Sequence, residues 1–215
     1  MRNPEKSGLK GDRVSFDMAA DRTLSGWGGE MTDWTITKCD PADLAEVADL
    51  VNAAYRGEGG QTGWTSEVGM VDGQRTTSAA LKEDLATSAA ASILVLRDAT
   101  DLLACVRLER TTGIRGQSIC YIGMLAVRPG AQDRGLGRAM LHRAEAEGIG
   151  MGTQVARMTV VSVRESLIAW YERHGYRRTG ETERFPYEDA RFGAPVRSDL
   201  EFVVLEKPLA VPPSA

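Results

Sequence analysis

Glycine and arginine are concentrated in residues 127–141, VRPGAQDRGLGRAML, between an apolar run and a helical pattern. A chain that passes through Gly135 and Gly137 into a helix leaves backbone N–H groups unpaired at the start of that helix. Those donors and the positive end of the helix dipole favour an anion, and glycine lets the backbone approach it closely. Arg134 and Arg138 add positive charge to the same turn. The segment therefore predicts a site for a small anion.

Three phosphate-binding patterns can be compared with this turn. The Walker A pattern fails because no Gly-Lys-Ser/Thr follows, and the dinucleotide fingerprint fails because Met140 stands at its third glycine position. The spacing that fits is Gln132-x-x-Gly135-x-Gly137, directly after the apolar run LAVRP at 125–129. A glycine-rich turn without a ligand remains the structural alternative.

A second stretch whose residues could take part in catalysis is LIAWYERHGY, residues 167–176. A tyrosine hydroxyl has an unperturbed pKa of about 10, so Tyr171 is protonated at neutral pH and can act as a general acid. The alternative is an ordinary aromatic residue on a helix face. His174 precedes Gly175, which ends the helix, so we expect His174 to cap the C-terminus rather than to act as a base.

Together these two stretches resemble the GCN5-related N-acetyltransferase (GNAT) family. The first is similar to its acetyl-CoA pyrophosphate loop, Arg/Gln-x-x-Gly-x-Gly/Ala, and the second to its helix that carries a tyrosine before a glycine and an aromatic residue. The resemblance covers Trp34 to Leu205. It implies direct transfer of an acetyl group from acetyl-CoA, as co-substrate, to an amine in a ternary complex, with no covalent enzyme intermediate.

The resemblance also implies roles for individual residues. Tyr171 is expected to protonate the departing thiolate. Backbone groups on the strand are expected to hold the pantetheine arm and the thioester carbonyl, and the amides of the turn to cradle the pyrophosphate. The expected cofactor-binding residues are Leu125, Ala126, Val127, Gln132, Asp133, Arg134, Gly135, Leu136, Gly137 and Arg138.

One position departs from the family pattern. Many members carry an asparagine seven residues before the tyrosine, where it bonds the pantetheine arm, and this chain has Arg164. No strand glutamate near residues 119–127 offers a general base. Glu58, Glu67 and Asp72 are candidates through water, although a solvated loop face is the commoner fate of such charges. The base stays unassigned.

The resemblance implies that the acceptor site lies between the long loop at 56–75 and the connection FPYEDARF at 185–192. Its expected walls are Trp64, Glu67, Phe185 and Tyr187. An acidic and aromatic lining suits a small primary amine, and Arg75 equally suits a carboxylate. The alternatives are a catalytically silent acyl-CoA-binding or regulatory module, a nucleotide-binding protein and a protein N-acetyltransferase.

Composition restricts the class of protein. With 215 residues, 42% hydrophobic and 26% charged, the chain suits one globular domain. A net charge of −4 argues against a nucleic-acid-coating protein. Cys39, Cys105 and Cys120 form no CxxC pair and no metal spacing, so free thiols in a reducing cytoplasm are expected, with no metal. No apolar run is long enough for a membrane span. A homodimer is left open.

The fold class expected is α/β, a single-domain GNAT-like mixed central sheet with helices on both faces. Residues 1–30 show no periodicity and are expected to be a disordered leader, residues 31–208 the acetyltransferase domain and residues 209–215 a flexible tail. Apolar periodicity predicts strands near 34–38, 93–97, 102–110, 119–127, 156–163, 176–183 and 200–205. It predicts helices near 40–57, 76–88, 136–148 and 162–175.

Overall fold

The computed structural model describes residues 34–57, 65–189, 191 and 193–209, all within the second of the chain's two units, Thr32–Ala215. The expected leader, residues 1–30, and most of the expected tail lie outside the described residues. The elements are β1 (Thr35–Lys38), α1 (Leu44–Arg56), β2 (Val71–Asp72), α2 (Ser78–Thr87), β3 (Ala91–Arg97), β4 (Leu102–Thr112), β5 (Ser118–Val127), α3 (Leu136–Gly150), β6 (Val155–Val161), α4 (Glu165–Arg173), β7 (Arg177–Arg184), β8 (Ala194–Pro195) and β9 (Glu201–Pro208).

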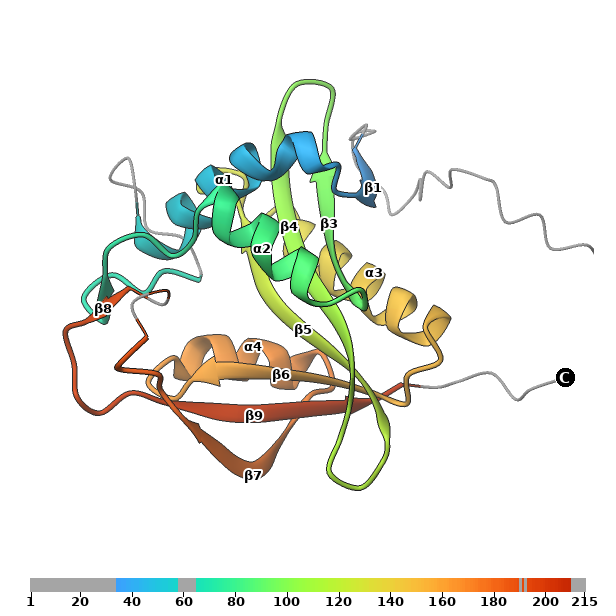
Figure 1. The fold of residues 1–215 in the computed structure, drawn as a ribbon, viewed down its shortest axis with the longest axis vertical. Helices are drawn as coiled ribbons and strands as arrows, with labels where there is room; N and C mark the ends of the chain where they lie inside the picture. The colour runs from blue at the N-terminus through green and yellow to red at the C-terminus, as the bar shows by residue number, and fades with distance from the viewer. Residues whose placement is uncertain (1–33, 58–64, 190, 192, 210–215) are drawn as a thin grey trace, which may run out of the picture. The chain divides into compact units, whose positions relative to one another are not determined.

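Seven strands form a mixed sheet in the order β1-β3-β4-β5-β6-β9-β7 (Figure 1). The β5–β6 pair is parallel, and the other pairs of this sheet are antiparallel. The expected α/β class and the expected order of these elements are confirmed. Their bounds shift slightly: the last strand, for example, ends at Pro208 rather than near residue 205.

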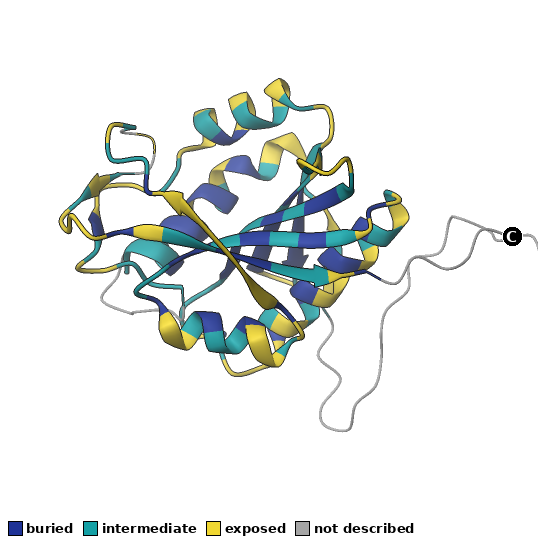
Figure 2. Ribbon diagram, turned by 90° about the horizontal axis from the view of Figure 1, so that it is seen from below, coloured by how far each residue is buried: buried dark blue, intermediate teal, exposed yellow. Residues whose placement is uncertain are grey.

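Helices cover both faces of the sheet, with their buried sides turned toward it (Figure 2). One apolar cluster joins α1 and α2 to the strands through residues such as Val47, Leu81 and Val95. A larger cluster joins α3 and α4 to the opposite face through residues such as Met140 and Ile168. Successive residues of a strand point alternately into one cluster and the other. The central strands are therefore apolar on both sides.

The helix signals in the sequence have the expected physical basis. Asp40 Oδ1 accepts from the Ala42 N–H at 2.9 Å, and the short 3₁₀ turn Pro41–Asp43 leads into α1. Gly57 ends α1 with φ of 70°, and its N–H donates to the Ala53 carbonyl. Thr77 caps α2 by accepting from the Ala80 N–H.

A β-bulge changes the direction of β5 in the middle of the sheet. Arg107 of β4 pairs with Gly123 and Cys105 pairs with Ala126, so Met124 and Leu125 together oppose a single β4 residue. Met124 takes a positive φ of 53° there. The parallel neighbour of β5 is β6, and these two strands pair only from Ile119 to Tyr121. Past Tyr121, and therefore also past the bulge, β5 and β6 are separate.

A second sheet of two strands was not predicted. β2 pairs with β8, and each strand has two residues. The small apolar cluster of Val71, Val161, Phe185 and Leu200 lies beneath them. This packing holds the chain before α2 against the connection that precedes β9.

A buried polar network ties α3 to β9. The Tyr176 hydroxyl donates to Glu145 Oε1 at 3.0 Å, and Lys207 Nζ donates to Glu145 Oε2 at 2.7 Å. Tyr176 is 1% exposed and Glu145 is 9% exposed. The pKa of Tyr176 is raised, first by burial and then by the Glu145 charge, so the hydroxyl remains a donor.

We expect Tyr176→Phe to destabilise the fold by about 1.5–3 kcal/mol, the usual contribution of a hydrogen bond to a charged group. Lys207 still pairs with Glu145 in this variant, so the carboxylate is not left alone. Urea unfolding of both proteins measures the difference in the free energy of unfolding. An unchanged unfolding midpoint would show that the network does not contribute to stability.

Candidate active site

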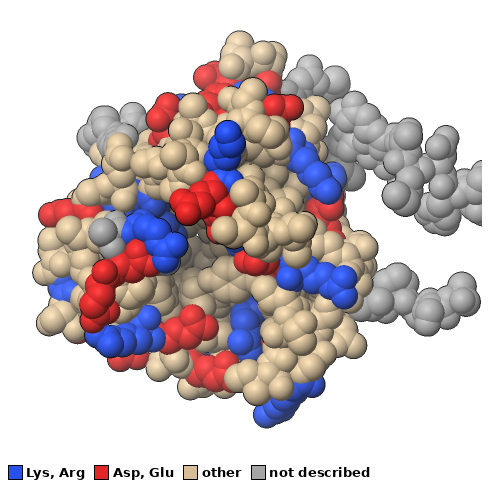
Figure 3. Space-filling model, viewed as in Figure 1, with Lys and Arg blue, Asp and Glu red and all other residues tan. Residues whose placement is uncertain are grey.

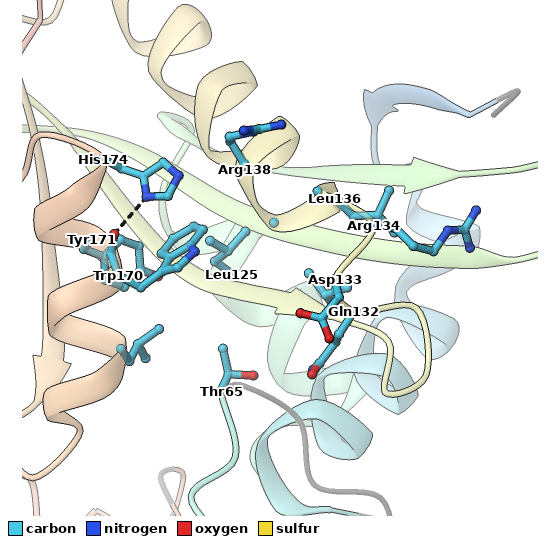
Figure 4. A pocket seen from close by; sticks show the side chains of 14 residues that line it. Thr65, Leu125, Gln132, Asp133, Arg134, Leu136, Arg138, Trp170, Tyr171 and His174 are labelled. Carbon is cyan, nitrogen blue, oxygen red and sulfur yellow. Dashed lines mark hydrogen bonds between the residues drawn. The ribbon is translucent and has the colours of Figure 1, made fainter. Parts of the chain in front are cut away.

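A pocket of about 520 Å³ opens where β5 and β6 separate. Figure 4 shows Trp170 on one side of it and Gln132 and Asp133 on the other, with Leu125 between them. The pocket thus joins the carboxyl end of β5, the turn before α3, and α4. Its lining residues are Thr65, Leu125, Val127, Gln132, Asp133, Arg134, Gly135, Leu136, Gly137, Arg138, Leu167, Trp170, Tyr171 and His174.

The turn before α3 has the geometry of an anion site. Gly135 is the N-cap of α3 with φ of 76°, and Asp133 also has a positive φ, 64°. No described side chain caps this helix end. The first N–H groups of α3 therefore face the pocket without an intrahelical acceptor, with the positive end of the dipole behind them. Arg134 and Arg138 are exposed at the same turn.

Gly137 keeps the pocket open beside this turn. A Cβ built there lies 3.6 Å from Val127 Cγ2 and 3.8 Å from Trp170 Cζ2, which are ordinary contact distances. Gly137 has no positive φ, in contrast to Gly135. A side chain at position 137 is therefore compatible with the backbone, but it occupies space between β5 and α4.

Aromatic rings form the wall on the α4 side. The Trp170 ring centroid lies 5.0 Å from that of Tyr171 and 4.2 Å from that of His174. His174 Nδ1 donates to the Trp170 carbonyl oxygen at 2.8 Å (Figure 4). The expected capping role of His174 is confirmed, although its ring also lines the pocket.

Tyr171 lines the pocket and is 6% exposed. Burial raises the pKa of its hydroxyl above the ordinary value, and the nearby Arg164 charge opposes this increase only in part. The phenol is therefore protonated throughout the neutral pH range. A buried, protonated hydroxyl that lines a pocket can donate a proton to a group bound there.

Arg164 occupies the N-cap position of α4 and is 8% exposed. Its guanidinium donates to the Ser66 carbonyl, and burial lowers its pKa. It thus ties the segment that carries Thr65, a pocket residue, to α4. The asparagine of the family pattern is replaced by a residue that bonds a loop of this chain.

The same segment is bound to the C-terminal end of α1. Glu67 forms an ion pair with Arg56, and the two side chains are only 13% and 6% exposed. The Glu67 N–H donates to the Tyr55 carbonyl at 2.7 Å. Glu67 is therefore held in an internal ion pair, whereas a solvated loop face was the commoner expectation.

Tyr55 bonds the pocket residue Leu125 from the α1 side, and the sequence did not single Tyr55 out. Its hydroxyl donates to the Leu125 carbonyl at 3.4 Å, and the Arg75 guanidinium carbon lies 5.6 Å from its ring centroid. The α1 periodicity included Tyr55 only as part of the apolar stripe. The sequence signal that could have identified Tyr55 is its polar hydroxyl at the end of an otherwise apolar stripe.

Apart from Glu67, which pairs with Arg56 and is not among the pocket's lining residues, the expected site residues fall into three groups. The pocket brings together Tyr171 and all the expected cofactor-binding residues except Ala126, whose side chain packs in the α1 cluster on the opposite face. Phe185 and Tyr187 pack in the cluster beneath β2 and β8, and Tyr187 exchanges hydrogen bonds with Leu200 rather than lining the pocket. Trp64 lies outside the described residues.

The three cysteines do not contribute chemistry to this pocket. All are free, with Cys105 and Cys120 buried. Burial raises the pKa of Cys39 and of Cys120 to about 11, so both thiols are protonated at neutral pH and weakly nucleophilic. Within the described ranges, no cluster of His, Cys, Asp or Glu is placed to hold a metal ion.

Comparison with known proteins places this geometry in a family. Residues 89–178 match the family model described as the acetyltransferase (GNAT) domain, a range that contains β5, the anion-binding turn and Tyr171. This part of the chain is similar to a GNAT acetyltransferase domain. The predictions of family and enzyme class, an N-acetyltransferase, are confirmed, and GNAT enzymes use acetyl-CoA. No curated protein matches the chain in sequence.

Solved structures of GNAT proteins share the fold at low identity. An acetyltransferase of the GNAT family from Streptococcus pneumoniae is 20% identical, with a TM-score of 0.60 over 83% of this chain and 100% of that chain. The ribosomal-protein-S18-alanine N-acetyltransferase from Escherichia coli is 15% identical, with a TM-score of 0.57 over 83% and 96%. A putative phosphinothricin N-acetyltransferase is 15% identical, with a TM-score of 0.61 over 83% and 99%.

These relatives are named for different acceptors, one for an alanine of a ribosomal protein and one for phosphinothricin. At this identity the likeness shows the GNAT fold and does not specify an acceptor. No helix in the described part of the chain is both long and apolar enough to cross a membrane.

Proposed function

We propose that this protein transfers the acetyl group of acetyl-CoA directly to a primary amine of a small molecule in a ternary complex. The observation that carries the proposal is one continuous pocket with an uncapped helix N-terminus at one end and the buried Tyr171 hydroxyl at the other. The acetyltransferase domain is proposed to comprise residues 31–208. The free thiols support a cytoplasmic location.

The pocket residues fit acetyl-CoA in order along its length. The amides of Leu136, Gly137 and Arg138 are aimed at the position of the pyrophosphate, and Arg134 and Arg138 balance its charge. The apolar side chains of Leu125, Val127 and Trp170 fit the pantetheine arm. Gly137 leaves room for that arm, because any side chain at position 137 would occupy the space between Val127 and Trp170.

Acetyl-CoA supplies an acetyl group activated as a thioester. The backbone of β5 past the bulge holds and orients that group, since these residues no longer pair with β6. The Tyr171 hydroxyl, kept protonated by burial, gives its proton to the departing sulfur. The segment around Thr65, tied down by Arg164 and Glu67, limits the access of water to the reacting end.

A small-molecule acceptor is supported by the way this end of the pocket is enclosed. The Thr65–Glu67 segment is bonded to α1 on one side and to α4 on the other. On the face seen in Figure 3, acidic and basic side chains are interspersed. On that face the described residues therefore form no broad single-sign surface of the kind that recognises a charged protein tail.

We expect acetyl-CoA to raise the melting temperature of the protein. A ligand at one hundred times its Kd stabilises the native state by about 2.7 kcal/mol, which corresponds to roughly 5–10 °C for a chain of this size. Differential scanning fluorimetry with acetyl-CoA, CoA and ATP measures the shifts. Equal stabilisation by ATP would indicate a nucleotide-binding protein, and no shift with acetyl-CoA would contradict cofactor binding.

Binding alone does not separate an enzyme from a silent acyl-CoA-binding module. The release of CoA from acetyl-CoA in the presence of a panel of primary amines tests transfer itself. We expect release that depends on both the amine and the protein. Binding without release on any amine would favour the silent module.

A further inference from the structure

We propose that Tyr55 is a positioning residue for acetyl transfer, whose hydroxyl holds the Leu125 carbonyl and thereby fixes the part of β5 that orients the thioester. The inference rests on the proposed function and adds to it a residue that the proton transfer from Tyr171 does not use. Three observations carry it: the strain in the β5 backbone, the bond that Tyr55 makes there, and the way in which Tyr55 is itself held.

The β5 backbone beside the pocket is strained. Met124 has φ of 53°, a left-handed conformation that a residue with a side chain keeps only where its surroundings hold it. Leu125, which lines the pocket, follows Met124 directly. β6 does not support this part of β5, because the two strands pair only from Ile119 to Tyr121. The direction of the Leu125 peptide group therefore depends on side chains that bond it.

Two side chains bond the backbone at this point. The Tyr55 hydroxyl donates to the Leu125 carbonyl at 3.4 Å, and the Cys105 thiol donates more weakly to the Met124 carbonyl at 3.9 Å. Tyr55 also packs in the same apolar cluster as Met124 and Ala126, the residues on either side of Leu125. The strained bulge is thus held from the α1 face, and the stronger of the two bonds comes from Tyr55.

Tyr55 and Tyr171 approach the backbone of β5 from opposite faces of the sheet. Tyr55 packs in the cluster that contains α1, and Tyr171 packs in the cluster of α3 and α4. Leu125 and Tyr171 line the same pocket (Figure 4). Burial raises the pKa of Tyr55, and the neighbouring Tyr171 adds to this increase, so the Tyr55 hydroxyl remains a donor. The two hydroxyls can therefore act separately, one on the departing sulfur and the other on the strand.

Tyr55 lies in the last turn of α1, which is fixed by a second set of bonds. Its backbone carbonyl accepts from the Glu67 N–H at 2.7 Å, and the Ala54 carbonyl accepts from Thr65 Oγ1 at 3.4 Å. The turn is thus tied to the neighbouring loop segment on one side and to β5 on the other. A fixed donor of this kind can restrict the position of a bound thioester, and a misplacement of about 1 Å can lower a rate by about 10²-fold.

The test follows the thioester carbonyl of bound acetyl-CoA by infrared difference spectroscopy, with an isotope label in that carbonyl and no amine present. The stretching frequency reports the hydrogen bonds and the environment of the carbonyl group. In the wild type we expect one narrow band, displaced from that of free acetyl-CoA. In Tyr55→Phe we expect the band to broaden and to move toward the free position, because Leu125 is no longer held.

Tyr55→Phe is also expected to lower the single-turnover rate at saturating acetyl-CoA by about 10- to 100-fold. The affinity for CoA, measured by calorimetric titration, should change little, because the turn before α3 and the Trp170 wall are untouched. The variant keeps the ring of Tyr55 and loses one long hydrogen bond, so we expect it to fold. Melting temperatures verify this.

Two controls separate positioning from stability and from proton transfer. Tyr176→Phe removes a buried tyrosine hydroxyl outside the pocket and is expected to keep the wild-type band and the rate per folded molecule. Tyr171→Phe is expected to keep the wild-type band and to lose the rate. Only Tyr55→Phe should change both.

Three results overturn the inference: a wild-type band in Tyr55→Phe, a wild-type single-turnover rate in Tyr55→Phe, or an equal change of the band in Tyr176→Phe. In each of these cases the wild type still transfers the acetyl group, so the proposed function stands. The absence of acetyl-CoA binding or of transfer in the wild type would instead overturn the proposed function, and this inference with it.

Discussion

Replacing Tyr171 with phenylalanine is expected to lower the single-turnover rate of acetyl transfer by about 10²- to 10⁴-fold, the usual contribution of a positioned general acid. The ring of Tyr171 packs between Trp170 and Tyr176, at centroid distances of 5.0 Å and 5.8 Å, and phenylalanine keeps those contacts. Acetyl-CoA affinity and melting temperature should therefore change little. Rapid-quench measurements of one turnover avoid masking by product release.

Tyr176→Phe provides the matched control for Tyr171→Phe. It also removes one buried tyrosine hydroxyl, but that hydroxyl bonds Glu145 and does not line the pocket. This control is expected to lose stability while keeping its rate per folded molecule, the opposite of the result for Tyr171→Phe. A wild-type single-turnover rate in Tyr171→Phe would exclude Tyr171 from the proton transfer.

Gly137→Val is expected to weaken acetyl-CoA binding by about 10²-fold, which corresponds to the loss of one or two charge-assisted hydrogen bonds at about 1.5–3 kcal/mol each. Its Cβ meets Val127 and Trp170 at ordinary contact distances, so the added side chain fills the pocket without straining the backbone. Calorimetric titration with acetyl-CoA measures the affinity.

Gly150→Val is a suitable control because Gly150 lies in the same helix and a Cβ there has no neighbour within 4 Å. Both variants should fold, and only Gly137→Val should lose affinity. Gly135 gives a less clear test, since its φ of 76° makes any substitution strained. Equal losses of stability and affinity in Gly137→Val would favour a purely structural role for this glycine.

That these residues line one pocket was predictable because their sequence signals are local. The glycine-rich turn lies within seven residues, 132–138, and Tyr171 lies on a helix whose end is marked by Gly175. Backbone donors at a helix start depend on the chain only over one or two turns. The sheet was predictable for a similar reason, since strand periodicity is also a short-range pattern.

The contacts around the pocket were not predictable because their residues come from separate segments. Tyr55 bonds Leu125 and Arg164 bonds Ser66 through tertiary packing, and no local pattern links these pairs. Phe185 and Tyr187, expected as acceptor walls, pack in the small apolar cluster beside the two-residue strands β2 and β8, and their role at an acceptor site stays a prediction. Strands of two residues have no periodicity to detect.

The most direct measurement of the central claim is the mass balance of the reaction with acetyl-CoA labelled in its acetyl group. The labelled amide product and the free CoA are quantified together by mass spectrometry, with and without protein. We predict that each CoA released is matched by one labelled N-acetyl amine, and that Tyr171→Phe slows both products equally. Release of CoA with labelled acetate in place of an amide, or release of neither product with any amine, would contradict the account.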